Sequence, residues 1–223
     1  MPTRKAIFSN NEFYHIFNRG VDKRKIILDH DDSDRFLKSI LFFNSKKPIG
    51  SIYEKTFSQN KLSPLGGLTA KSDKLVNIVA YCLNPNHFHF ILEQKIDGGI
   101  SEFMKRLGGG YTWYFNYKYK RNGSLFQGSF KSVFADKNEY LLHLSAYISL
   151  NNRVHKLGGL TAKLARSSWN EYLNDKKCFS LCTKDIILSQ FKNSEEYRRF
   201  AESSLKEISR RREEEEISKI ILE

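Results

Sequence analysis

The chain has 223 residues, of which 40% are hydrophobic, enough for one good core and a small appendage and too many for a disordered protein. It carries 37 basic and 25 acidic residues, a formal net charge of +12. Residues 184–223 hold 9 basic and 10 acidic residues, so residues 1–183 hold the other 28 and 15, an excess of +13. That excess favours a polyanionic partner, most commonly nucleic acid, over a merely soluble basic protein.

Membrane and zinc-knuckle classes do not fit the chain. No stretch approaches the roughly 20 apolar residues of a membrane helix, and the first residues lack the apolar core of a signal peptide. Cys82, Cys178 and Cys182 do not suggest a disulfide framework, and the C-x3-C pair lacks a second pair of zinc ligands. We therefore expect a reducing, cytoplasmic location.

Hydrophobic periodicity predicts alternating strands and helices. In the first half of the chain we expect a strand at 13–17, a helix at 31–43, an inserted loop near 44–73, a strand at 78–83 and a strand from His87. A helix at 100–120, broken or bent at Gly108-Gly109-Gly110, should follow, and then a loop and strand at 123–134. The last two elements are a helix at 136–152 capped by Asp136 and a charged, solvated helix at 195–221. The alternation favours a mixed sheet with helices on one face.

One heptapeptide, Leu-Gly-Gly-Leu-Thr-Ala-Lys, occurs at 65–71 and again at 157–163. Nothing around the two copies matches, so they are no solenoid repeat. Both fall where loops are expected, and a short DNA repeat inserted twice would be tolerated there.

His87-Phe88-His89 opens the strand after a tight Asn84-Pro85-Asn86 turn. Because side chains alternate along a strand, both imidazoles should point to one face and Phe88 to the other. Two imidazoles on one face can hold a divalent metal. The alternative is a polar pair on the wet face of a strand.

The helix at 136–152 offers partners for such a metal. Tyr147 and Asn151 are four residues apart and therefore lie one above the other. A tyrosine hydroxyl can act as a covalent nucleophile, and an asparagine carbonyl is a hard oxygen ligand for Mg²⁺ or Mn²⁺. Core packing of Tyr147 is the alternative, and Tyr140 is a second candidate nucleophile.

Basic and aromatic residues interleave between 105 and 131, a pattern typical of single-stranded nucleic-acid binding, in which cations follow the phosphates and rings stack on bases. About half of the aromatic residues are expected to be core instead. The candidate phosphate contacts are Arg19, Lys105, Arg106, Lys118, Lys120, Arg121 and Lys131.

Four ordered motifs resemble a known family. They are Tyr14-His15-Ile16-Phe17-Asn18-Arg19-Gly20, Leu83-Asn84-Pro85-Asn86-His87-Phe88-His89, Tyr114-Phe115-Asn116-x-Lys118-Tyr119-x-Arg121-x-Gly123 and Tyr147-Ile148-Ser149-Leu150-Asn151. Over residues 10–172 the chain resembles the single-tyrosine HUH transposases, and within them the REP-associated tyrosine transposases. It departs from the family in having Asn152, where proline is frequent, and in the long insertion near 44–73.

The resemblance implies an α+β fold, a ferredoxin-like or RRM-like antiparallel sheet with helices on one face. It implies that His87 and His89 bind Mg²⁺ or Mn²⁺ with help from Asn151, and that Tyr147 attacks a single-stranded DNA phosphate to give a 5′-phosphotyrosine. Hairpin DNA is the implied substrate, in a bacterial, nucleoid-associated setting. A homodimer is left open, because family members differ in how the active site is shared.

We accordingly expect a transposase domain over residues 1–172 and a charged helical extension over 173–223. Two other functions remain open. One is a domesticated protein of the same fold that grips hairpin DNA or RNA without cutting it. The other is a metal-dependent hydrolase that uses activated water, for which Tyr147→Phe would keep activity.

Overall fold

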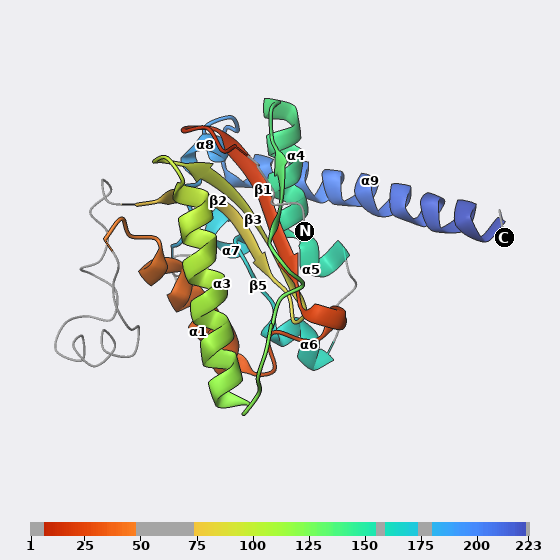
Figure 1. Cartoon of the computed structure of the whole chain (residues 1–223). Helices are drawn as coiled ribbons and strands as arrows, with labels where there is room; N and C mark the ends of the chain where they lie inside the picture. The colour runs from red at the N-terminus through yellow and green to blue at the C-terminus, as the bar shows by residue number, and fades with distance from the viewer. Residues whose placement is uncertain (1–6, 48–73, 155–158, 174–179, 222–223) are drawn as a thin grey trace.

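The computed structural model describes residues 7–47, 74–154, 159–173 and 180–221. Its centre is a five-stranded antiparallel sheet of order β4-β1-β3-β2-β5 (Figure 1). The strands are β1 (Phe13–Arg19), β2 (Val76–Leu83), β3 (His87–Gln94), β4 (Lys131–Phe134) and β5 (Arg166–Ser167).

Helices occupy most of the remaining described chain, and none of those described is long and apolar enough to cross a membrane. They are the 3₁₀ helix η1 (Val21–Lys23) and the α-helices α1 (His30–Phe43), α3 (Gly99–Lys118), α4 (Asn138–Ser149), α5 (Asn151–Val154), α6 (Gly159–Leu164), α7 (Trp169–Tyr172), α8 (Asp185–Leu188) and α9 (Ser194–Ile221).

One face of the sheet packs on α1 and α3, and α3 crosses the front of the sheet in Figure 1. Phe88 and Phe90 of β3 point to this face and meet Phe36 of α1, with ring centroids 5.5 and 6.4 Å apart. Tyr111 of α3 is fully buried there and donates a hydrogen bond to the Ile26 carbonyl at 2.7 Å. This layer is the larger of the two cores.

The other face of the sheet carries a second core. Ile91 of β3 and Cys82 of β2 point to it and pack with Leu144 and Ile148 of α4 and with Tyr197 of α9. The predicted class, an antiparallel sheet covered by helices with a helical C-terminal segment, is therefore confirmed. The expected placement of helices on one face is incomplete, because α4 and α9 cover part of the second face as well.

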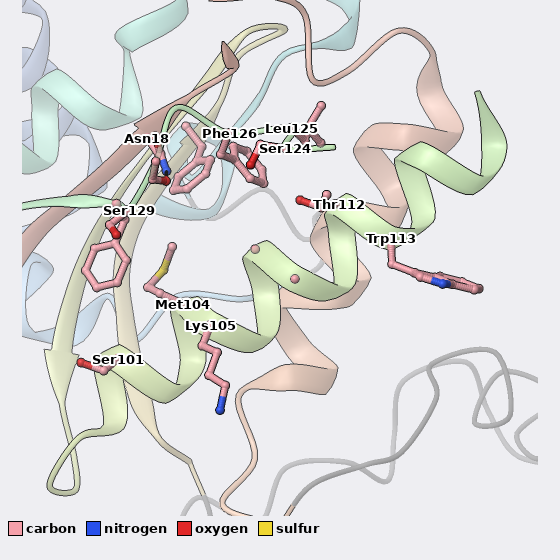
Figure 2. Close-up of a pocket in the computed structure, with 15 residues that line it drawn as sticks. Asn18, Ser101, Met104, Lys105, Thr112, Trp113, Ser124, Leu125, Phe126 and Ser129 are labelled. Atoms are coloured by element: carbon pink, nitrogen blue, oxygen red, sulfur yellow. Dashed lines mark hydrogen bonds between the residues drawn. The ribbon is translucent and has the colours of Figure 1, made fainter. Parts of the chain in front are cut away.

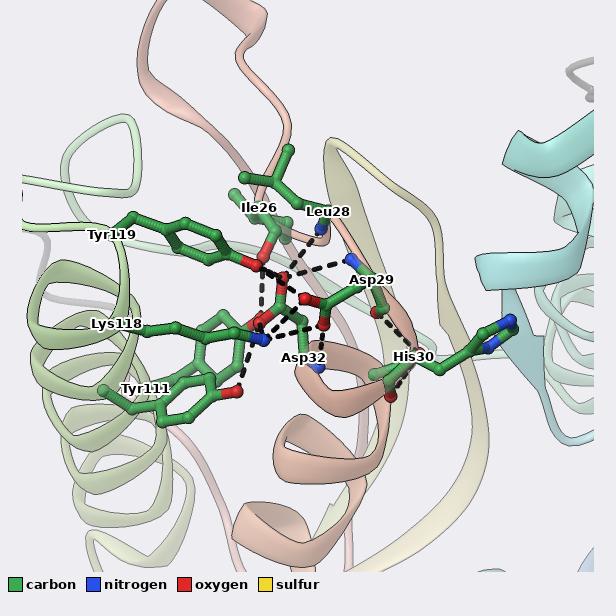
Figure 3. A network of polar contacts seen from close by, with 10 residues as sticks. Ile26, Leu28, Asp29, His30, Asp32, Tyr111, Lys118 and Tyr119 are labelled. Carbon is green, nitrogen blue, oxygen red and sulfur yellow. Dashed lines mark hydrogen bonds and ion pairs between the residues drawn. The ribbon is translucent and has the colours of Figure 1, made fainter.

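An ion-pair network joins the end of α3 to the start of α1 (Figure 3). Asp29 caps α1 in a capping box with Asp32, which is fully buried. The Lys118 amine lies 2.7 Å from Asp29 Oδ2 and 2.9 Å from Asp32 Oδ1, and Tyr119 donates to Asp32 Oδ2 at 2.8 Å. Partial desolvation lowers the pKa of Lys118, but these hydrogen bonds outweigh it and raise that pKa above its ordinary value.

Two local predictions are wrong. Residues 99–118 form one continuous helix, so α3 runs through Gly108-Gly109-Gly110 without a break. Helix α4 begins at Asn138 after an N-cap at Lys137 that makes no side-chain cap bond, so Asp136 is not the cap.

Two further predictions concern inserted segments. The insertion near 44–73 lies outside the described residues from 48 onward, as does the first copy of the heptapeptide. Of the second copy, the described residues 159–163 fall in α6 and not in a loop.

Helix α9 is less solvated than its charge predicts. Tyr197 and Ala201 are fully buried in the second core, while Arg198 makes ion pairs with Glu195 and Glu202. The start of α9 is therefore part of the packing that holds α4 against the sheet. The division of the chain between 172 and 173 stays a prediction.

Candidate active site

Strand β3 places two histidines on the face that α4 covers. Phe88 and Phe90 point into the larger core, so His87 and His89 point to the opposite face, as the alternation predicted. Their ring centroids are 5.2 Å apart and their planes are nearly perpendicular, at 86°. Both rings are half-buried.

Helices α4 and α5 bring the other two predicted residues to the same place. The Tyr147 ring lies edge-on to His89, with centroids 5.9 Å apart. Asn151, the first residue of α5, is fully buried, and its Oδ1 lies 3.2 Å from His87 Nε2. The structure thus collects His87, His89, Tyr147 and Asn151 from three elements into one site.

The turn before β3 orients His87. Asn86 Oδ1 accepts a hydrogen bond from His87 Nδ1 at 2.6 Å, because an amide oxygen has no proton to give. In the neutral ring, Nε2 then carries the lone pair, and Asn84 Nδ2 donates to it at 2.9 Å. The same Asn84 nitrogen donates to Asn151 Oδ1 at 2.7 Å. Its two N–H groups therefore occupy the space between the two candidate ligand atoms.

His89 has a comparable partner in His15 of β1, whose Nε2 lies 2.9 Å from His89 Nδ1. Burial lowers the pKa of His15 to about 4, so this ring is neutral at physiological pH. If His89 carries its proton on Nδ1, that N–H donates a hydrogen bond to His15 Nε2. His89 Nε2 is then the nitrogen that can hold a metal. Ligating histidines commonly donate their other N–H in this way.

Sequence reasoning missed His15 and Asn84 as site residues. His15 faces Ile91 across β1 and β3 and reaches His89 diagonally, so its role depends on the strand register. The signal available in the sequence was its position: in β1 it shares a face with Phe13 and Phe17, on the side opposite to the core residues Tyr14 and Ile16.

The donor set fits a hard divalent cation. His87 Nε2 lies 3.2 Å from Asn151 Oδ1, with the His89 ring beside that of His87. Asn151 Nδ2 is buried without a hydrogen-bond partner, so its amide is not fully satisfied by the chain. No group of three His, Cys, Asp or Glu side chains that could hold a metal exists among the described residues. The chemistry therefore suits a cation that keeps open positions for a substrate, such as Mg²⁺ or Mn²⁺, more than a closed structural zinc.

Two of the predicted DNA-contacting cations have partners within the protein. Lys118 is held by Asp29 and Asp32 in the network of Figure 3. Arg106 pairs with Glu102 at 2.7 Å and donates to the Ser45 carbonyl at 2.6 Å, and its side chain is only 16% exposed. Both interactions join α3 to α1 or to the residues that follow it.

The other predicted cations lie nearer to solvent. Lys120 and Lys131 are exposed, and Lys105 is 80% exposed in a loose pair with Glu102 at 3.7 Å. Arg19 is exposed and donates to Gln127, and Arg121 donates to Asn116 at 3.1 Å. These side chains lie on α3, on the segment after it, on β4 and at the end of β1.

Comparison with known proteins finds a similarity to transposases over part of the chain. A family model described as "Transposase IS200 like" matches residues 68–152. The matched span contains His87, His89, Tyr147 and Asn151, and the match confirms the resemblance to transposases that the motifs indicated. It supports a transposase-type function.

The other comparisons add little. Comparison with the curated proteins finds no match. Among solved structures, the chain is similar to one titled "Structure of the REP associates tyrosine transposase bound to a REP hairpin", with 11% identity, a TM-score of 0.43, and coverage of 83% of this chain and 93% of that chain. A likeness this low carries no functional argument, so the assignment to the REP-associated group stays a prediction.

Proposed function

We propose that the protein is a metal-dependent endonuclease and strand-transfer enzyme that nicks and rejoins hairpin-bearing single-stranded DNA through a 5′-phosphotyrosine on Tyr147. The observation that carries the proposal is the meeting of His87, His89, Asn151 and Tyr147 on one face of the sheet. Any one of these residues has an ordinary structural explanation. The combination of two oriented imidazoles, an amide oxygen and a tyrosine has none that the fold requires.

His87, His89 and Asn151 would hold the cation. When bound, Mg²⁺ or Mn²⁺ would supply charge neutralisation for the scissile phosphate. Asn86 and His15 keep the Nδ1 atoms of the two histidines occupied, so that Nε2 of each is the ligating nitrogen. Their contribution is orientation, which a flexible histidine pair would lack.

Tyr147 performs the covalent step. Its hydroxyl oxygen attacks the phosphorus, a new O–P bond forms, and the bond from phosphorus to the 3′ oxygen breaks. The phenol loses one proton and the departing 3′ oxygen gains one, so the strand leaves with a free 3′-OH. The phosphotyrosine keeps a phosphodiester bond, and a 3′-OH from another strand can reverse the step without an external energy source.

The cationic surface serves the substrate. Arg19, Lys105 and Lys120, with Arg121 and Lys131, are placed to contact phosphates, and the excess of +13 over residues 1–183 attracts a polyanion. Lys118 and Arg106 would act mainly through the fold. The setting expected for such an enzyme is the bacterial cytoplasm at the nucleoid, and a homodimer stays open.

The test is incubation with end-labelled, hairpin-bearing single-stranded DNA in Mn²⁺, followed by denaturing electrophoresis. The proposal predicts a covalent protein–DNA band that disappears with EDTA and in Tyr147→Phe, while Tyr147→Phe still shifts the DNA in a native gel. Tyr140→Phe, two turns earlier on α4 and 38% exposed, is the matched control and should keep the band. A band that persists in Tyr147→Phe contradicts the proposal.

One observation favours a binding protein that does not cut. The Asn84 amide, between His87 Nε2 and Asn151 Oδ1, already satisfies both atoms and would have to yield to a cation. If a cation does not displace the Asn84 amide, the protein binds hairpin DNA without cutting it. In that case Mn²⁺ would leave the melting temperature unchanged, and DNA would be shifted with no covalent band in any variant.

A further inference from the structure

A groove lies along α3 (Figure 2). It is on the opposite side of the sheet from Tyr147, which packs against the second core. Its volume is about 570 Å³, within the range of sites that hold small ligands. Phe88 lines it, and Phe88 points away from the face that carries His87 and His89. The other wall is the segment 124–130, so the groove opens between α3 and the loop that leads to β4.

Two glycines keep the groove open on the α3 side. The lining residues of α3 recur at helical spacing, and Gly108 and Gly109 stand in the middle of this face. A Cβ built on either glycine would have no atom within 4 Å, whereas on Gly110 it would lie 2.5 Å from the Phe43 ring. Packing within the described chain therefore requires Gly110 and leaves Gly108 and Gly109 unexplained.

Glycine inside a helix is destabilising relative to alanine. Two adjacent glycines therefore weaken α3, and no close packing against them in the described chain offsets this loss of stability. Close approach of a ligand to the helix backbone is a recognised reason to keep glycine at such a position. The groove has the matching space, because these two residues form part of its lining.

Charge identifies the kind of ligand. The stretch 103–135 includes the greater part of both walls of the groove and contains no aspartate or glutamate. Its cations are Lys105, Arg106, Lys118, Lys120, Arg121 and Lys131. Two of them, Arg106 and Lys118, are paired within the fold, whereas Lys105 lines the largely apolar cleft itself. A ligand with flat apolar parts and a polyanionic backbone matches this surface.

Aromatic side chains at the rim strengthen the identification. Trp113 lines the groove, is 64% exposed, and stacks on Tyr117, which is 77% exposed. The two rings are 5.5 Å apart between centroids and 9° from parallel. Figure 2 shows the Trp113 ring pointing outward from α3, away from the cleft. The pair is a stacking platform beside the cleft, of the type on which unpaired bases lie.

We propose that this groove binds an unpaired stretch of single-stranded DNA, with one base against the backbone of Gly108 and Gly109 and a neighbouring base on Trp113. The proposal rests on the proposed function for the choice of DNA as the polyanion. It adds a second strand-binding site, which the sheet separates from the nucleophile. The hydroxyls of Thr112, Ser124 and Ser129 line the cleft and can bond base edges.

The test is a size series at one position, Gly108→Ala and Gly108→Leu. Binding is measured by fluorescence anisotropy with a labelled 20-nucleotide single strand of mixed sequence, with the blunt duplex of the same sequence and with the single strand as RNA. Melting temperature is measured in parallel. Gly108→Leu should weaken single-stranded DNA binding about tenfold, the value of one stacked base, and leave duplex binding unchanged. Gly108→Ala should raise the melting temperature by about 1–4 °C.

If Gly108 has only a structural role, Gly108→Leu should lower the melting temperature and weaken binding of the single strand and of the duplex together. That result would overturn the proposal. Unchanged single-strand binding in a folded Gly108→Leu protein would also overturn it, as would loss confined to the RNA strand. If leucine prevents folding, Trp113→Ala at its exposed position replaces it, with the same tenfold loss expected and unchanged binding contradicting the proposal.

The covalent assay separates this proposal from the proposed function. A wild-type protein that forms no phosphotyrosine band but loses single-strand binding in Gly108→Leu would support the groove and contradict the chemistry. A protein that forms the band while Gly108→Leu binds DNA normally would do the reverse.

Discussion

Replacement of Asn84 by aspartate should destabilise the metal-free candidate site and make its stability depend on a bound cation. Asn84 is fully buried, and its amide nitrogen donates at 2.9 Å to His87 Nε2 and at 2.7 Å to Asn151 Oδ1. An aspartate of nearly the same shape would place an acceptor oxygen opposite two other acceptors. The change removes two hydrogen bonds and puts a carboxylate against lone pairs in a buried position.

The size of the effect follows from those two contacts. Each lost hydrogen bond costs about 1 kcal/mol, and acceptors left unsatisfied in the interior add about 1–3 kcal/mol. In EDTA, Asn84→Asp should therefore lower the free energy of unfolding by about 2–5 kcal/mol, and the melting temperature should fall by several degrees. A cation bound between the carboxylate, His87 and Asn151 should reverse this. Saturation at about 100 times its dissociation constant restores about 2.7 kcal/mol.

The assay is thermal melting of wild type and variant in EDTA and across a Mn²⁺ titration. Asn86→Asp is the matched control, because Asn86 is half-exposed and its Oδ1 accepts from His87 Nδ1, a bond that a carboxylate preserves. This control should melt close to wild type in EDTA. If Asn84→Asp melts like wild type in EDTA, or gains no more from Mn²⁺ than wild type does, the proposed cation position is wrong.

Two further predictions concern the scaffold of α3. Lys118→Met should lower the free energy of unfolding at pH 7 by about 1.5–3 kcal/mol, measured by denaturant melting, because it removes charge-assisted hydrogen bonds to Asp29 and Asp32; a change below about 0.5 kcal/mol would contradict the role of the network. Partial desolvation raises the pKa of Asp29, but the hydrogen bonds from Lys118, the Asp32 backbone and Tyr119 outweigh it and hold that pKa below its ordinary 3.8. This part of wild-type stability is present above the ordinary pKa and is lost as the pH falls through the lower folded value, so the melting temperature of Lys118→Met should fall less than that of wild type below about pH 4. Gly110→Ala should destabilise the fold by about 1–3 kcal/mol, because its Cβ would meet the Phe43 ring, and a melting temperature above that of wild type would contradict the packing.

The sequence was sufficient for features that depend on local pattern. Alternation in β3 placed His87 and His89 on one face, and helical spacing placed Tyr147 and Asn151 on one side of the α4–α5 segment. Each inference needed only residues at most four positions apart in the chain. The contact between His87 and Asn151 joins two elements, and the ordered motifs of the resembled family supplied what spacing could not.

Features that depend on distant partners were missed. Lys118 was assigned to DNA, yet it is bonded to Asp29, 89 residues earlier in the chain. Glycines inside a helix predicted a break at 108–110, but the buried residues on either side, Leu107 and Tyr111, hold α3 in the larger core. His15 became visible as a partner of His89 only through the register of β1 and β3.

The central claim is that Tyr147 becomes covalently bonded to DNA. The most direct measurement is mass spectrometry of the protein after reaction with hairpin-bearing single-stranded DNA and Mn²⁺, nuclease trimming and tryptic digestion. The account predicts a nucleotide joined through its 5′ phosphate to Tyr147. An adduct on Tyr140, or cleaved DNA with a free 5′ phosphate and no adduct on any residue, would contradict it.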